Sequence, residues 1–174
     1  MYIAKAQAAA GIDDRHWARL RDQQMKISRT VAGTGLAVLT DCGEFDNIHP
    51  LDKETVGLRL ALQARSRVYG EDICADAPVV SRVDFREGKA LAHFARTGGF
   101  LKVRGDAPEG FEIAGEDGIF YPADGRIEAD TVILRSEQVS EPAYLRYAWK
   151  NYCRPNLYGA SGLPAAPFRT DTFA

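Results

Sequence analysis

Residues 36–69 read LAVLTDCGEFDNIHPLDKETVGLRLALQARSRVY, and the fold prediction depends on this stretch. Its first five residues form an unbroken apolar run, which is typical of a parallel strand covered on both faces. A polar loop over 41–50 leads to a helix, which Asp52 can cap and which extends to about Tyr69. Gly70 is suited to end that helix. Strand, loop and helix in this order predict one crossover unit of a parallel α/β sheet.

A second unit of the same kind precedes this one. The apolar run at residues 2–6 predicts a strand, and Asp13 or Asp14 can cap the helix that follows. Each predicted helix has a stripe of residues at helical spacing that should face the sheet. In the first helix the stripe is Trp17, Leu20, Gln24 and Ile27. In the second it is Val56, Leu60, Ala64 and Val68, and Leu58 and Leu62 widen it. The basic residues of the first helix lie largely off its stripe and are expected on a solvated face: Arg15, Arg19, Arg21 and Lys26.

The hydrophobic period changes to two from about Pro78 onward. Val79, Val83 and Phe85 begin an alternating pattern, and further strands are predicted at 89–96, 111–114, 119–123, 126–128, 131–135 and 143–149. We expect an antiparallel sheet or sandwich of about six to seven strands, followed by an ordered coil over 152–174. The predicted fold class is therefore α/β followed by β, with an α/β domain over 1–72 and an antiparallel β-sandwich-like domain over 76–174.

Composition excludes several classes of function. The 174 residues include 22 basic and 24 acidic side chains, and this balance gives no electrostatic footprint for nucleic acid or an anionic membrane. No apolar run approaches the ~18–20 residues of a membrane span, and the first residues make a poor signal peptide. The three cysteines are widely spaced and lack a CxxC pair, so neither a zinc knuckle nor a disulfide scaffold is expected.

The chemistry of the chain is concentrated in the loop over 41–50. His49 follows Asp46 by three residues, just past the carboxyl end of the predicted strand, where catalytic groups gather in open α/β sheets. A carboxylate on one ring nitrogen of a histidine leaves the other nitrogen able to take a proton from a nucleophile. Pro50 restricts the backbone of His49 to extended conformations. Taken by its spacing alone, an Asp-x-x-His-Pro match is also compatible with a plain surface loop.

Two other interpretations of these and neighbouring side chains are weaker. A metal site would use several of the loop's candidate ligands, Asp41, Cys42, Glu44, Asp46 and His49, but the loop holds a single imidazole, so no metal and no cofactor is predicted. His16 and His93 are expected to be ordinary surface or hydrogen-bonded histidines. The late aromatic residues could stack on sugar rings but are expected chiefly in the core: Tyr144, Tyr147, Trp149, Tyr152 and Tyr158.

The loop and its flanks resemble a known family. DNIHPLDKETVGLRLA at 46–61 looks like the C-terminal catalytic block of sialate O-acetylesterases, which are SGNH-type carbohydrate esterases. The resemblance continues in family order through WARLRDQQ at 17–24, GTGLAV at 33–38, GFEIAG at 110–115, RYAW at 146–149, NLY at 156–158 and GLPAAPFRTD at 162–171. It implies that residues 1–72 are the C-terminal βαβα remnant of a doubly wound SGNH-type parallel sheet.

The resemblance also implies an activity and its residues. Members of the family hydrolyse acetyl esters on sugars with a serine nucleophile, a histidine base and usually an aspartate. His49 matches the family histidine, and Asp46 is the preferred carboxylate, with Asp41 as the alternative. The substrate would be an acetylated carbohydrate. The family suggests a secreted, periplasmic or lysosomal location.

The sequence departs from the family at the nucleophile. The Gly-x-Ser block followed by Asn is absent, as are the Gly and Asn blocks that supply oxyanion donors, and Ser161 lies in the tail rather than at a strand-to-helix turn. We therefore expect the isolated chain to be inactive and to need an N-terminal catalytic segment or chain that carries the serine, with a homo-oligomer as a further possibility. The alternative is a catalytically silent accessory or carbohydrate-binding module with a β-sandwich and an α/β remnant.

Overall fold

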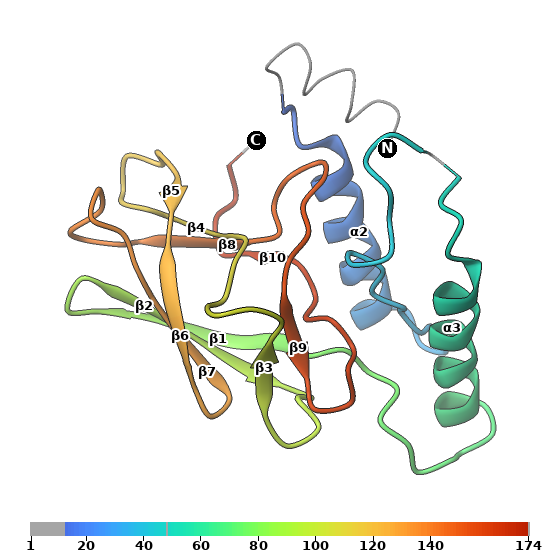
Figure 1. Ribbon diagram of the computed structural model, residues 1–174. Coiled ribbons are helices and arrows are strands. Elements are labelled where there is room, and N and C mark those ends of the chain that lie inside the picture. Colours follow the sequence, from blue (N-terminus) through green and yellow to red (C-terminus); the bar gives the residue numbers. More distant parts are fainter. Residues whose placement is uncertain (1–12, 48, 174) are drawn as a thin grey trace.

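The computed structural model describes residues 13–47 and 49–173, which form mostly antiparallel sheets with two helices beside them (Figure 1). The helices are α2 (His16–Thr30) and α3 (Lys53–Arg67). The first sheet runs in the order β1 (Val79–Arg86), β2 (Lys89–Ala95), β7 (Thr131–Arg135) and β6 (Asp124–Glu128). The second runs β10 (Phe168–Arg169), β8 (Tyr144–Tyr147), β4 (Phe111–Ala114) and β5 (Tyr121–Pro122), and a third pairs β3 (Leu101–Val103) with β9 (Leu157–Gly159).

The main core lies between the two four-stranded sheets. In the first sheet Ala92 of β2 stands opposite Val132 of β7, and both side chains are fully buried. Ile113 of β4 and Leu145 of β8 are also paired and fully buried in the same cluster. Burying each large aliphatic side chain contributes about 1.5–3 kcal/mol. The antiparallel pairing predicted from the period of two is confirmed.

The tail beyond residue 152 was predicted to be an ordered coil, but it contains two short strands. It supplies the short strands β9 and β10, and Leu157 and Ala165 are completely buried in the main core. Leu157 pairs with Val103 of β3, so the tail closes one side of the β-rich part. Strands of two or three residues leave no hydrophobic period in a sequence, which is why the prediction missed them.

The strand predicted over residues 36–40 is not formed. Between α2 and α3 the described chain contains no strand, and every strand pair in the described ranges is antiparallel. Val38 is the one buried side chain of the run and packs against Ala77, Leu163 and Ala166. A strand needs a partner for its ladder, and the neighbour expected at residues 2–6 lies outside the described residues.

Both helices form where they were predicted, and one cap is confirmed. The Asp52 side chain accepts a hydrogen bond from the Thr55 N–H at 2.9 Å and so caps α3. The N-cap of α2 is Arg15 rather than Asp13 or Asp14. The two carboxylates still accept backbone N–H groups at this end, Asp13 from Arg15 and Asp14 from His16. No helix in the described ranges is long and apolar enough to cross a membrane.

The stripe predicted to bury α2 faces away from the β-rich part. Leu20 and Ile27 are 46% and 52% exposed. Two of the four basic residues that were expected in water dock instead: Arg15 donates to the Trp149 carbonyl at 2.9 Å, and Arg21 donates to the Ala148 carbonyl at 3.2 Å. These hydrogen bonds to backbone carbonyls hold α2 in place. Arg19 and Lys26 are exposed, as expected.

Helix α3 likewise leaves most of its predicted apolar stripe exposed. Leu60 and Val68 of its predicted stripe are 54% and 75% exposed, whereas Gln63 is buried and donates from its amide to the Ala75 carbonyl. Leu62, which was placed at the edge of the stripe, packs against the cluster around Val38. The two helices therefore contact the rest of the described chain largely through polar side chains, with Met25 and Leu62 packing against the cluster around Val38, and they leave most of the predicted stripes exposed.

Candidate functional site

The loop that carries His49 lies beside the two helices, directly before the start of α3 (Figure 1). After α2 the chain turns back and runs beside it, between α2 and α3, before it enters the loop over 41–50 (Figure 1). Asp52 then starts α3 directly after the loop. Helix α3 thus begins where the loop ends.

Glu44 braces the loop from inside. One of its carboxylate oxygens accepts from the Asn47 side-chain amide at 3.0 Å, and the other accepts from the Leu51 backbone N–H at 2.7 Å. Asn47 in turn accepts the His49 backbone N–H at 2.9 Å. The backbone at His49 is therefore held by a chain of hydrogen bonds, although sequence analysis gave Glu44 no role beyond that of a possible metal ligand.

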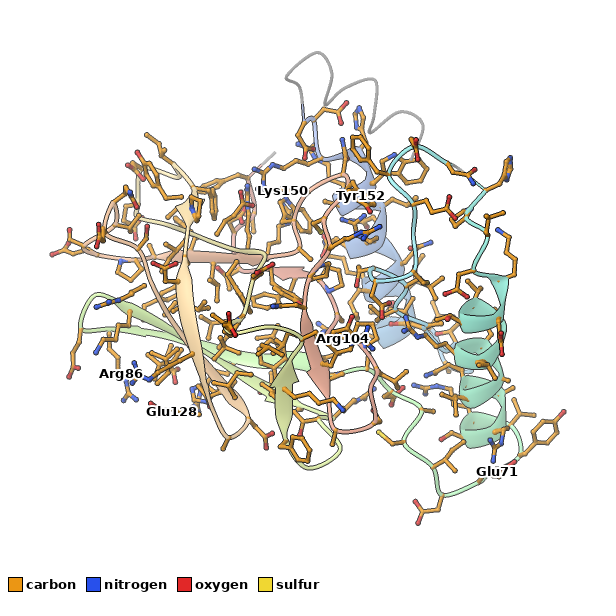
Figure 2. All side chains as sticks on the ribbon, viewed as in Figure 1. Glu71, Arg86, Arg104, Glu128, Lys150 and Tyr152 are labelled. Carbon is orange, nitrogen blue, oxygen red and sulfur yellow. The ribbon has the colours of Figure 1, made fainter. Side chains whose placement is uncertain are left out.

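An aromatic contact ties the loop to the tail. The rings of Phe45 and Tyr152 meet edge to face with 5.1 Å between their centroids. Figure 2 shows Tyr152 beside α2, and Tyr152 lines the same groove as Trp17 of that helix. The loop is consequently attached to α2, α3 and the tail.

Asp41 forms an ion pair at the base of the loop. Its two carboxylate oxygens accept from the Arg59 guanidinium at 2.6 and 2.8 Å, a bidentate geometry that is among the stronger ones for charged groups. Arg59 also donates to the Val38 carbonyl at 2.6 Å. The side chains of Asp41 and Arg59 are 9% and 11% exposed, so water screens the pair little.

The protonation of Asp41 follows from this environment. Burial opposes ionisation, but the hydrogen bonds and charge of Arg59 outweigh it, and the Tyr158 hydroxyl adds to them, so the pKa of Asp41 is lowered. The Tyr158 ring is also covered by the Arg104 guanidinium at 4.1 Å, beside β9 in Figure 2. Asp41 thus links the His49 loop to α3 and to the β-rich part.

The structure places Asp46 and His49 in the same loop with both residues exposed. Within the described ranges, the His49 ring makes no hydrogen bond to Asp46 or to Asp41. The Asp41 carboxylate is held by Arg59 instead. The pairing of His49 with Asp46 stays a prediction.

The Asp41–Arg59 pair should make stability depend on pH. A carboxyl whose pKa is lower in the folded than in the unfolded chain stabilises the fold above its unfolded pKa of about 3.9, and this contribution is lost as the pH falls through the folded pKa. Replacing Arg59 by methionine should therefore lower the free energy of unfolding at pH 7 by about 3 kcal/mol, and by less below pH 4.

Urea denaturation from pH 7 to pH 3 measures this difference. Arg65→Met is the matched control, since Arg65 lies on the same helix in an exposed ion pair with Glu71. An Arg59→Met loss that is equally large at pH 3 and pH 7 would contradict the assigned role of the Asp41 carboxylate.

The other candidates from the sequence have ordinary surroundings. His93 contacts Asp84 through Nε2 and Thr131 through Nδ1, both at 3.0 Å, which is the hydrogen-bonded histidine that was expected. The possible metal ligands of the loop do not converge, because the described residues contain no group of three or more that could hold an ion. Ser161 is exposed, in the turn after β9.

Most of the late aromatic group is in the core, as expected. Tyr147, Trp149 and Tyr158 are all at most 3% exposed. Buried rings of this kind cannot stack on a sugar, so this group gives the alternative of a carbohydrate-binding module little support.

Three residues shape the site in a way that sequence analysis did not predict: Arg59, which it did not single out, and Tyr152 and Tyr158, which it did not connect with the loop. Arg59 had a detectable signal, since it is the one charged residue of the apolar stretch over 56–62. A charge in such a place indicates a buried partner. The two tyrosines lie more than 100 residues from the loop, and one sequence gives no sign of that proximity.

This chain is similar to known carbohydrate acetylesterases. A crystal structure of a carbohydrate acetylesterase from Xanthomonas citri matches 90% of this chain with a TM-score of 0.86 and 45% sequence identity. The match covers 37% of that longer chain. No family model matches the sequence.

The curated relatives make the similarity more specific. The chain is 26% identical, over 181 aligned positions, to the sialate O-acetylesterases of Homo sapiens and of Pongo abelii. The alignment covers 95% of this chain and 34% of each relative, so the chain spans about a third of their length. The chain is thus similar to the C-terminal portion of a sialate O-acetylesterase.

Proposed function

We propose that this chain supplies the histidine base and its carboxylate to a carbohydrate O-acetylesterase that works by a Ser-His-Asp mechanism. The observation that carries the proposal is the braced loop that presents His49 three residues after Asp46, in a chain similar to acetylesterases over nearly its whole length. The serine would come from polypeptide outside this chain. Residues 1–72 would then complete a doubly wound parallel sheet, with 76–174 as a separate β-sandwich-like domain.

In the proposed reaction His49 moves the protons. It takes the proton of the serine hydroxyl as the serine oxygen bonds to the acetyl carbonyl carbon, and Asp46 stabilises the imidazolium that forms. The tetrahedral intermediate expels the sugar oxygen, which receives that proton from His49. Water then attacks the acetyl-enzyme with His49 again as base, and acetate leaves with the serine restored. The oxyanion donors would also come from outside the chain.

The pure chain tests where the nucleophile resides. We expect it to hydrolyse p-nitrophenyl acetate no faster than its His49→Ala variant, because a base without a nucleophile retains background imidazole chemistry alone. Initial rates over a range of substrate concentrations measure this, with His16→Ala as a control for loss of an exposed imidazole elsewhere. A saturable rate that depends on His49 would place the serine within this chain instead.

The alternative of a silent accessory module makes a different prediction. It requires that no acetyl ester is hydrolysed even when the chain is combined with the polypeptide that its relatives carry beyond the matched region. The same assay on the combined proteins therefore separates the two functions.

A further inference from the structure

We propose that an arginine-lined cavity at the far end of the two helices is a binding site for a phosphate group, carried either by free phosphate or by a phosphorylated sugar. The cavity has a volume of about 240 Å³ and lies where α2 and α3 end and β1 begins. Its charged side chains are Arg29, Arg67, Arg96 and Asp76. The proposal goes beyond the esterase function and does not rest on it.

The cavity is remote from the loop that carries His49. Asp52 caps the start of α3 directly after that loop, whereas Arg67 is the last residue of the same helix. A helix of 15 residues is about 22 Å long, and both helices end on the side of the molecule away from the loop (Figure 1). A small ligand in this cavity therefore cannot contact an ester bound at His49.

The charges that line the cavity do not balance. Three guanidiniums and one carboxylate line it, so the formal charge of the lining is three minus one, or +2. Asp76 is that carboxylate, and its two oxygens are already paired, one with Arg67 and the other with Arg96, both at 2.8 Å. A phosphate group carries nearly two negative charges at neutral pH and would balance the remaining charge.

Two of the guanidiniums are held in place by the fold. The buried Gln63 side chain accepts from Arg67 Nε at 2.8 Å, and Asp76 then joins Arg67 to Arg96, which lies one residue past the end of β2. A guanidinium has five N–H donors, so both arginines retain donors that these contacts do not use. Donors fixed in this way bind an oxyanion at a lower entropic cost than free side chains do.

The third guanidinium has no partner in the described part of the chain. Arg29 lies in the last turn of α2, and its side chain makes no hydrogen bond or ion pair within residues 13–47 and 49–173. Arginines at the ends of helices can simply complement the helix dipole, which would account for Arg29 and Arg67. It would not account for Arg96, which lies on no helix. The convergence of all three on one cavity therefore favours an anion as their common partner.

The size of the cavity narrows the class of ligand. At about 240 Å³ it is smaller than the ~300–1,000 Å³ of sites for drug-sized ligands, which favours a single phosphate or a phosphorylated monosaccharide over an oligosaccharide. Guanidinium groups match phosphate oxygens through paired N–H donors. Leu36 and Val79 also line the cavity and offer an apolar surface to the carbon skeleton of a sugar.

Isothermal titration of the full chain with inorganic phosphate tests the site, at neutral pH and at an ionic strength held constant with sodium chloride. We expect a Kd below about 1 mM, weakened at least about tenfold by Arg29→Gln, because a charge-assisted contact is lost. Arg19→Gln is the matched control, since it removes the same charge from an exposed site on the same helix and should leave the Kd unchanged. The absence of saturable binding, or equal weakening by both variants, would overturn the proposal.

Thermal unfolding gives a second measurement of the same binding. Excess phosphate should raise the unfolding midpoint of the parent chain and of Arg19→Gln by a few degrees, and that of Arg29→Gln by less. An equal rise in all three chains would show a general salt effect and overturn the proposal.

The source of the phosphate group is identified by titration with glucose 6-phosphate and with glucose. Binding of glucose 6-phosphate that is tighter than that of inorganic phosphate supports a phosphorylated sugar, and equal or weaker binding supports free phosphate. Glucose that binds as tightly as its phosphate would overturn the proposal. Esterase activity has no part in these measurements, so their failure would leave the proposed function standing.

Discussion

Replacing His49 by alanine should reduce the turnover of an acetyl ester on the order of 10⁴-fold or more in the esterase assembled from this chain and the remainder of its Xanthomonas citri relative. Without the imidazole the serine proton has no acceptor, while binding of the ester is unaffected. The loss should therefore appear in kcat with little change in KM. His93→Ala is the matched control, because His93 is a hydrogen-bonded histidine on the β-rich side.

The same assay should distinguish which of the two candidate carboxylates, Asp46 or Asp41, orients His49. Asp46→Asn should lower kcat strongly, because an amide no longer stabilises the imidazolium. Asp41→Asn should mainly lower stability, since it removes the partner of Arg59. The reverse pattern would assign the orienting role to Asp41, and full activity in His49→Ala would refute the proposed mechanism.

Replacing Asp171 by alanine should cost about 3–5 kcal/mol of the free energy of unfolding. Asp171 is completely buried and accepts two hydrogen bonds from Arg146, at 2.7 and 2.8 Å, while the Arg146 guanidinium also covers the Phe120 ring at 3.7 Å. Burial opposes its ionisation, but Arg146 outweighs this and lowers the pKa of Asp171. Removal of the carboxylate would leave the guanidinium buried without its counter-charge.

Two comparisons sharpen this measurement by chemical denaturation at pH 7. The double variant Arg146→Met with Asp171→Leu removes both charges of the buried pair and should recover part of the loss, because Arg169, which also contacts Asp171 at 3.5 Å, still loses its partner. Glu128→Ala breaks the exposed pair with Arg126 and should cost less than about 1 kcal/mol. A loss for Asp171→Ala as small as that for Glu128→Ala would show that the buried pair contributes little.

Sequence patterns predicted the β-rich part well because its strands face a core that the chain itself supplies. Val83 and Phe85 pack against the main core as the alternation predicts, whereas the register shifts between Val80 and Arg82, so that Val80 packs there and Val79 packs against the cluster around Val38. The turn at Glu87 and Gly88 has the left-handed backbone, with φ of 51° and 70°, that a two-residue hairpin needs. These are local signals. The short strands at Leu157 and Phe168 pair with strands that are distant in sequence, so they have no local signal that could predict them.

The helical side shows the limit of the same reasoning. The apolar stripes through Leu20 and Leu60 were predicted, but hydrophobic periodicity shows only which face of a helix is apolar and does not show which part of the protein that face packs against. The described chain offers the helices backbone carbonyls and carboxylates instead, so Arg21 and Arg59 turn inward. The Asp46–His49 spacing was visible in the sequence, whereas the bracing by Glu44 and Tyr152 required the fold.

The docking of α2 onto residues 148–151 has a consequence for the order of folding. The hydrogen bond from Arg15 to the Trp149 carbonyl joins residues 134 apart, whereas the hairpin of β1 and β2 closes over two residues. Contacts with such long loops form late, because their closure entropy is lost before the contact is gained. During synthesis at ~5–20 residues per second, α2 would wait on the order of 10 s for its docking site. During that interval the apolar side chains of α2 are open to binding by a chaperone. In ribosome-stalled chains, α2 should become protected from proteases only after residue 151 has emerged.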